Sequence, residues 1–290
     1  MKHHEPIRRS LRIESGDGAS ATLELLFPTT PSAPDQTQPA LFFLPALGVG
    51  VNPNLRFATG MARQGVAVAV MEWRGLGSSS LRAGRNTDWN YRHLLELDIP
   101  AALHAAREAL PNARWSIGGH SLGGQLALVT AGQMPEHFER VQLIGSGHPY
   151  WRGFAKPWGV RAFAWSIPAI TALAGHFPGK KLGFAGREAK GLMRDWAITC
   201  RRGDYRIPGI GDRLQEGLDR FTGRVHAVNF AHDWLATRGS LDNLRRLVPN
   251  AKWSDTFLGH DVFKTVKADH FGWLKEPDPV VHELLTAAER

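Results

Sequence analysis

The sequence predicts one α/β domain built on a mainly parallel, doubly wound sheet with helices on both faces. Short apolar runs typical of buried strands alternate with longer helical patterns along most of the chain. Glycine-rich loops follow several of these runs, at the carboxyl ends of the expected strands, where parallel sheets bind ligands. A chain of 290 residues can form one large core and still carry an insertion.

The expected elements follow in order from the N-terminus. Residues 11–14 and 21–27 flank the turn SGDG and predict a hairpin, and residues 28–39 form a polar loop broken by prolines. The long helical pattern over 86–110 is expected to be capped at Thr87 or Asp88. The other expected strands are 41–44, 66–71, 114–117, 141–144, 225–230 and 252–258, and the other expected helices are 55–64, 122–133, 240–248 and 279–288.

The composition is that of a soluble globular protein, with 43% hydrophobic and 21% charged residues. The single cysteine, Cys200, excludes an intrachain disulfide and a metal site built from cysteines. No run reaches the roughly 18 apolar residues of a membrane span. No apolar segment follows the basic start MKHHEPIRRS, so we expect no secretory signal and a cytoplasmic protein.

The net charge of +8 is concentrated in one segment. Residues 148–224 hold 14 Lys and Arg against 6 Asp and Glu, and the rest of the chain is balanced. The alternation of strands and helices stops over the same segment and resumes at residue 225. We therefore expect a core domain formed by 1–147 and 225–290, interrupted by a separate unit over 148–224.

The stretch GGHSLGGQ, residues 118–125, has the G-x-S-x-G form of a nucleophile elbow. It lies between an expected strand and an expected helix, which is the context that this motif requires. Ser121 on such a sharp turn takes strained backbone angles, and Gly119 and Gly123 keep the strand and the helix from colliding. The pattern predicts a nucleophilic Ser121, with the N–H of Leu122 aimed at a developing oxyanion.

Three stretches resemble the α/β-hydrolase superfamily: FFLPALGVG (42–50), MEWRGLGSSS (71–80) and GGHSLGGQ. The second is similar to the family's D/Y-x-R-G-x-G-x-S loop. With RDWAITCRRGDY (194–205) and DHFGWLK (269–275), the chain resembles a bacterial group of predicted α/β-hydrolases akin to serine aminopeptidase-like lipases and esterases. The resemblance covers nearly the whole chain. It implies that 148–224 is an inserted helical cap and that neither a metal nor an organic cofactor is needed.

The family's chain order, Ser, then Asp or Glu, then His, indicates the acid that would assist Ser121. Asp233 follows the expected strand 225–230, where the family pattern places this acid. Asp242 and Asp255 are rivals, the first expected at a helix start and the second inside a strand.

The base is expected after the last strand, where residues 269–273 resemble the family's terminal histidine loop. This favours His270 over its rival His260, which is expected too close to the end of the strand. Alignment with the family's first buried strand suggests Leu47 N–H as the second oxyanion donor, with Ala46 adjacent. The common His-Gly pair of the family is replaced here by Pro45 and Ala46.

The residues expected to line the pocket are His120 and several aromatic side chains of the segment 148–224. Trp151, Trp158 and Trp165 are spaced by seven residues and fit one helix face, although Pro157 interrupts it. Most of these rings are expected to pack against the core, while Trp151 and Trp158 are candidates for an acyl pocket. Further proline breaks are expected at 168, 178 and 208.

These features predict a serine hydrolase that cleaves a small-molecule carboxylic ester, as an esterase or lipase does. The basic segment suits an anionic substrate, a lipid-like one or a membrane surface. A peptidase, thioesterase or acyltransferase would use the same groups, and a non-catalytic binding protein would keep the fold alone. The stretch GLG at 75–77 lacks the third glycine of a dinucleotide-binding motif, and no nucleic-acid-binding motif is present, so neither partner is expected.

Overall fold

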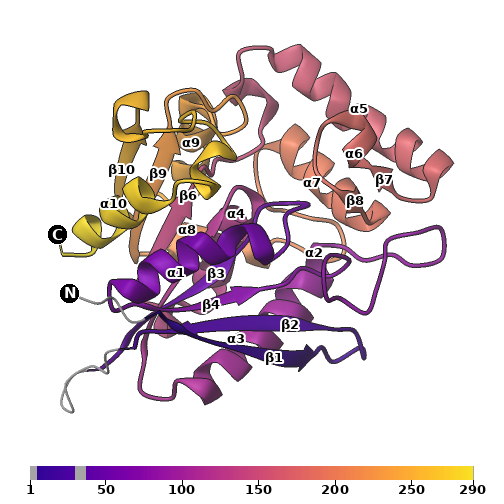
Figure 1. Cartoon of the computed structure of the whole chain (residues 1–290). Coiled ribbons are helices and arrows are strands. Elements are labelled where there is room, and N and C mark those ends of the chain that lie inside the picture. Colours follow the sequence, from indigo (N-terminus) through magenta and orange to yellow (C-terminus); the bar gives the residue numbers. More distant parts are fainter. Residues whose placement is uncertain (1–4, 30–36, 290) are drawn as a thin grey trace.

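The computed structural model describes residues 5–29 and 37–289, so most of the expected loop 28–39 lies outside the described residues (Figure 1). Its main sheet has the strand order β1-β2-β4-β3-β5-β6-β9-β10. Strand β2 runs antiparallel to β1 and β4, and the strands from β4 to β10 pair in parallel. The mainly parallel sheet expected from the sequence is confirmed. The strands are β1 Ile7–Glu14, β2 Ser20–Phe27, β3 Pro39–Leu44, β4 Ala67–Met71, β5 Arg114–His120, β6 Arg140–Ile144, β9 Arg224–Phe230 and β10 Lys252–Leu258.

Helices cover both faces of this sheet because side chains alternate along each strand. Leu41 and Phe43 of β3 face one apolar layer, while Phe42 and Leu44 face the other. The first layer is closed by α1 and α10, and the second by α3, α4, α8 and α9 (Figure 1). The helices are α1 Leu55–Arg63, α3 Ile99–Ala109, α4 Leu122–Gln133, α8 Arg213–Arg220, α9 Arg238–Arg245 and α10 Asp278–Glu289.

The helix expected over 86–110 begins later than the sequence suggests. Asn90 caps it through a reciprocal pair of contacts with His93, so α2 spans Tyr91–His93. A π-helical turn, Leu94–Asp98, then leads into α3. The proposed cap Asp88 instead accepts a hydrogen bond from the amide of Gly191 at 2.9 Å. The expected start was therefore wrong because Asp88 is used by a distant segment.

The segment 148–224 contains α5 Pro157–Ala174, α6 Gly179–Leu182, α7 Lys190–Arg202 and α8, with a small hairpin of β7 Phe177–Pro178 and β8 Arg187–Glu188. Helices α5, α6 and α7 lie together at the upper right of Figure 1, beyond the sheet. Helix α8 packs on α4 instead, where Gly132 and Gly217 lie backbone to backbone. The break expected at Pro168 is wrong: this proline lies inside α5 at an exposed position, and the helix continues past it.

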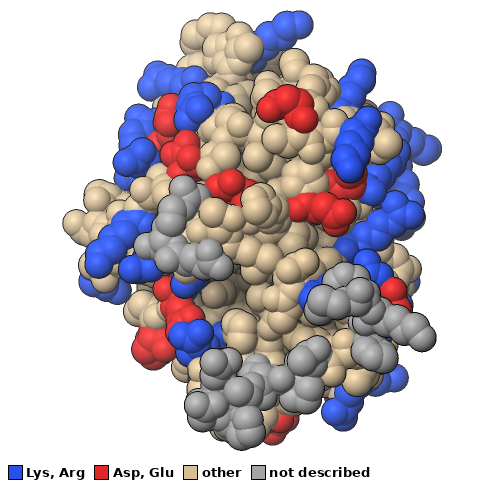
Figure 2. All heavy atoms as spheres, turned by 60° about the vertical axis from the view of Figure 1, so that its left-hand side comes forward, with Lys and Arg blue, Asp and Glu red and all other residues tan. Residues whose placement is uncertain are grey.

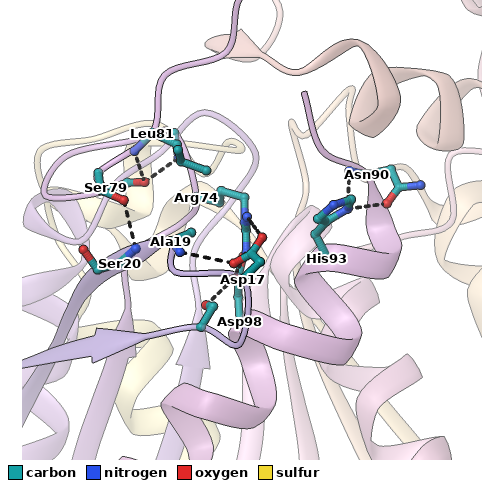
Figure 3. A network of polar contacts seen from close by, with 12 residues as sticks. Asp17, Ala19, Ser20, Arg74, Ser79, Leu81, Asn90, His93 and Asp98 are labelled. Carbon is teal, nitrogen blue, oxygen red and sulfur yellow. Dashed lines mark hydrogen bonds and ion pairs between the residues drawn. The ribbon is translucent and has the colours of Figure 1, made fainter. Parts of the chain in front are cut away.

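A buried ion-pair network anchors the loop that follows β4 (Figure 3). Arg74 donates through Nε to Asp98 Oδ2 at 2.8 Å and through Nη1 to Asp17 Oδ2 at 2.6 Å. Ser15 donates to Asp98 Oδ1 at 2.6 Å. The guanidinium therefore joins the loop to the β1–β2 turn and to the π-helical turn before α3.

The glycines of this loop are required by packing. Gly75 has a φ of +90°, and a Cβ there would overlap the ring of Trp89. Gly77 has a φ of +39°, and a Cβ there would overlap the carboxylate of Glu72. The close approach of Trp89 and Glu72 therefore explains why residues 75 and 77 are glycines, and no nucleotide-binding role is needed to explain them.

Removing the buried carboxylate at position 98 should destabilise the fold strongly. In Asp98→Ala the Arg74 guanidinium stays buried with only Asp17 as its partner, so we expect a loss of about 3 kcal/mol or more. The exposed pair of Arg63 and Glu5 provides the control, because Arg63→Ala should change stability by less than about 1 kcal/mol. Urea unfolding measures both, and equal effects would contradict the anchoring role of Arg74.

Candidate active site

The turn between β5 and α4 holds Ser121 in a strained conformation. Its φ of 55° and ψ of −120° lie where non-glycine residues are rare. The amide of Ser121 donates to the carbonyl of Ile144 at 3.0 Å, and its carbonyl accepts from the hydroxyl of Ser146 at 2.5 Å. Both backbone groups of the strained residue are therefore satisfied by the end of β6 and the loop after it.

The glycines on either side of Ser121 allow backbone to pass against backbone. A Cβ at Gly119 would overlap the backbone of Gly123 and lie 2.6 Å from the carbonyl oxygen of Leu44. A Cβ at Gly123 would overlap the carbonyl oxygens of Leu44 and Pro45. The elbow thus lies directly against the end of β3, where the sequence analysis places the second oxyanion donor.

Asp233 and His270 are joined by a buried hydrogen bond between two loops. The carboxylate atom Oδ2 of Asp233 lies 2.7 Å from His270 Nδ1. The other oxygen, Oδ1, accepts from the amides of Leu235 and Ala236 at 2.8 and 2.9 Å. In a neutral imidazole, a proton on Nδ1 donated to Asp233 would leave Nε2 as the nitrogen with a free lone pair.

The ring of His270 lies beside the elbow. Its centroid is 4.8 Å from that of His120, the residue immediately before Ser121. A Cβ on Gly145 would lie 3.4 Å from both Asp233 Oδ2 and His120 Cδ2. Asp233 and His270 therefore lie beside the residue that precedes Ser121, at the carboxyl ends of β5, β6 and β9.

His120 is buried beneath this cluster. Burial, and to a smaller extent the neighbouring His270, holds the pKa of His120 well below its usual value. The ring also packs against Trp273, with centroids 5.2 Å apart. The side chain of His120 is therefore neutral, and His270 packs against an uncharged ring.

The rival residues lie elsewhere. His260 is exposed and stacks on His232 at 4.4 Å, and its Nδ1 accepts from the amide of Ala268. Asp255 pairs with Arg238 at 3.0 Å. Asp242 is exposed on α9. Within the described residues, the carboxylate that contacts His270 is that of Asp233.

The two predicted oxyanion donors line one small cavity. Leu47 and Leu122 share it with Trp73, Glu188 and Leu192, and its volume of about 10 Å³ gives room for about one water molecule. Leu122 is the first residue of α4, so its N–H has no acceptor within the helix. The indole of Trp73 donates to the carbonyl of Pro45 at 2.9 Å and fixes the loop that carries Leu47.

Glu188 is a site residue that the sequence analysis did not identify. Its side chain is 2% exposed and accepts from the amide of Gly186 at 2.9 Å. Gly186 in turn lies against Gly48, because a Cβ on Gly48 would overlap the amide nitrogen of Gly186. Burial raises the pKa of Glu188 to about 7. In the sequence this glutamate is one charge in a basic segment, and no local pattern indicates that it is buried.

The remaining pocket candidates divide into two groups. His120 packs against His270, whereas Ala46 is buried in the loop after β3, next to Leu47. Trp151 is buried in a short turn outside α5, and its ring packs 4.9 Å from that of the exposed Trp158. The structure thus brings neither tryptophan to the cavity of Leu47 and Leu122. No group of three or more His, Cys, Asp or Glu within 5–29 and 37–289 is arranged to hold a metal ion.

Residues 39–277 match the family model of the alpha/beta hydrolase fold, and the chain belongs to this family. Comparison with curated proteins gives no significant match. Among solved structures, the chain is similar to Est1E from Butyrivibrio proteoclasticus with bound ferulic acid, at 16% identity and a TM-score of 0.62, over 96% of this chain and 98% of that one. The esterase EaEST from Exiguobacterium antarcticum matches at 14% identity and a TM-score of 0.64, over 97% and 100%. An acylaminoacyl peptidase from Pyrococcus horikoshii matches at 13% identity and a TM-score of 0.61, over all of this chain but 42% of that one.

Glu188 should make the stability of the protein depend on pH. Its folded pKa of about 7 lies above the ordinary value of 4.5, so the folded state binds the extra proton between these values. Stability is therefore lost as pH rises from about 4.5 to about 7, by about 3 kcal/mol. Glu188→Gln removes this loss, and the variant should gain stability relative to the wild type between pH 5 and pH 8.

Urea unfolding at both pH values measures this gain. The exposed Glu216→Gln serves as the matched control and should leave the pH dependence unchanged. A Glu188→Gln profile parallel to that of the wild type would mean that the carboxyl group is not buried as described.

Proposed function

We propose that the protein is a serine hydrolase that cleaves a carboxylic ester through Ser121, His270 and Asp233. The observation that carries this proposal is the 2.7 Å hydrogen bond between Asp233 and His270, placed beside the strained turn of Ser121. Membership of the alpha/beta hydrolase fold family supports a hydrolase, and esterases among the structural neighbours support an ester substrate.

In the proposed reaction, His270 Nε2 takes the proton of the Ser121 hydroxyl as Oγ attacks the ester carbonyl. The N–H groups of Leu122 and Leu47 donate to the oxyanion of the tetrahedral intermediate. The imidazolium, stabilised by Asp233, then gives its proton to the leaving alcohol, which departs and leaves an acyl-enzyme. A water molecule, deprotonated by His270, attacks the acyl-enzyme and releases the acid.

We further propose that 148–224 forms a cap on a core made of 1–147 and 225–290. The support is the contact of Gly186 with Gly48, which brings this segment directly against the loop after β3 that carries Leu47. Leu192 of α7 and Glu188 form the wall of the small cavity on the same side. Such a cap would control which acyl groups reach Ser121.

Kinetics of ester hydrolysis tests the assignment of the three residues. Ser121→Ala and His270→Ala should each lower kcat by at least about 10⁴-fold, because the nucleophile or its base is lost. Asp233→Asn should lower kcat by about 10⁴-fold, because the imidazole then adopts the wrong tautomer. The matched control His260→Ala should keep nearly full activity. A strong loss in His260→Ala with an active His270→Ala would reverse the assignment.

The acyl preference should depend on the wall formed by Leu192. Because the cavity holds about one water, Leu192→Ala should raise kcat/KM for long-chain p-nitrophenyl esters relative to short ones. An aminoacyl amide, assayed beside the esters, separates an esterase from a peptidase, and we expect the ester to be the better substrate. An unchanged chain-length profile in a folded Leu192→Ala variant would exclude this cavity as the acyl site.

A further inference from the structure

Helix α5 presents an apolar face to the outside of the molecule. Its 18 residues include one charged side chain, Arg161. Trp158, Trp165 and Leu173 are 66%, 59% and 82% exposed. At 100° per residue these three lie on one arc of the helix with the exposed Ala162 and Ala169.

The other side of α5 is apolar as well. Ala164, Ile167 and Thr171 are buried, and the helix packs against α7. A helix that is apolar all round is ordinarily covered on every side. Yet α5 lies at the outer edge of the structure, where Figure 1 shows no described element above it. Its outward face is therefore available to a partner.

Four basic side chains surround this face. The Arg161 guanidinium lies 5.4 Å from the Trp158 ring, and that of Arg201 lies 4.4 Å from the Trp165 ring. Arg152 lies over Trp151, which packs on Trp158, and the exposed Lys156 directly precedes α5. Within residues 5–29 and 37–289, no ion pair joins any of these four cations to a carboxylate, and residues 140–187 contain no Asp or Glu.

The segment 148–224, which contains α5, carries the whole positive excess of the chain, with 14 Lys and Arg against 6 Asp and Glu. On the face viewed in Figure 2, acidic and basic side chains are interspersed, with red groups between the blue ones. We call Trp158, Ala162, Trp165, Ala169 and Leu173, with Arg152, Lys156, Arg161 and Arg201, the α5 face. It combines exposed aromatic and aliphatic groups with unpaired positive charge.

We propose that the α5 face docks on the surface of an anionic lipid bilayer. Tryptophan places its apolar ring and its N–H group at the boundary between acyl chains and headgroups, while arginine and lysine attract anionic headgroups. A second copy of the chain would bring like charges together, and a nucleic acid would leave Leu173 and the alanines without an apolar partner. No helix in the described part of the chain is long and apolar enough to span a membrane, so α5 would lie in the plane of the interface.

Vesicle sedimentation tests this proposal on the full chain. Every protein carries Ser121→Ala, so that the result does not depend on the proposed hydrolysis. Vesicles of phosphatidylcholine alone are compared with an equimolar mixture of phosphatidylcholine and phosphatidylserine. We expect binding to the anionic vesicles that weakens in about 1 M salt, where charges are screened beyond about 3 Å.

Two pairs of substitutions locate the surface. Trp158→Ser with Trp165→Ser, and Lys156→Glu with Arg161→Glu, should each weaken binding by at least about tenfold. The matched controls are Ile7→Ser with Val262→Ser, which are also exposed apolar residues, and Arg9→Glu with Lys252→Glu, which change the charge equally. These controls should bind like the parent.

Three results would overturn the proposal. The parent protein could fail to bind anionic vesicles, or the α5-face variants could bind as well as the controls. The third result is that the parent does not bind vesicles but forms a dimer or binds RNA in the absence of lipid, and that the α5-face variants lose this dimer or RNA binding. Apart from Arg161, which is half-buried, the substituted side chains are exposed, and thermal unfolding verifies that each variant is folded.

Discussion

The close backbone packing around Ser121 is the constraint on which the candidate site depends. A non-glycine residue in this conformation costs of order 1–3 kcal/mol, and the neighbouring strands maintain it. Gly119 and Gly123 bring the turn against the end of β3, and the Ser121 backbone is satisfied by Ile144 at the end of β6 and by Ser146 in the loop after it. The position of the hydroxyl group is thus set by strands that are distant in sequence.

Buried polar groups hold the loops that meet at this turn. Asn229 donates through Nδ2 to the carbonyls of Ser146 and Ala236, at 3.2 and 3.1 Å, and so joins the loop after β6 to the loop of Asp233. On the other side, Glu72 accepts from the amide of Val51, below the loop that carries Leu47. Burial removes water from the Glu72 carboxyl and so raises its pKa above the usual value. These contacts fix the backbone of the loops around the candidate site.

Local sequence signals identify the elbow but not everything around it. Glycine spacing predicts the turn at Ser121, and α4 begins and ends where its periodicity indicates. The position of Glu188 depends on the pairing of β7 with β8 and on the packing of Gly186 against Gly48, and the second of these contacts joins segments far apart in the sequence. The helix at 86–110 starts late because Asp88 binds Gly191, 103 residues away.

The tryptophan spacing shows a second limit of sequence reasoning. Pro157 begins α5, so Trp151 falls in a separate turn, while Trp158 and Trp165 share a helix face. Periodicity correctly groups these last two residues, but it cannot tell which side of a wholly apolar helix is covered. The choice of Asp233 over Asp242 and Asp255 likewise rests on the family's chain order and on the position of Asp233 just after an expected strand, because no local pattern around Asp233 marks it as the acid.

Covalent labelling of Ser121 is the most direct test of the central claim that His270 and Asp233 serve this hydroxyl. The protein is treated with a fluorophosphonate, digested, and the modified peptide is identified by mass spectrometry. The account predicts an adduct on Ser121 in the wild type and in His260→Ala, and little or none in His270→Ala. An adduct on another residue, or equally fast labelling of Ser121 in His270→Ala, would contradict it.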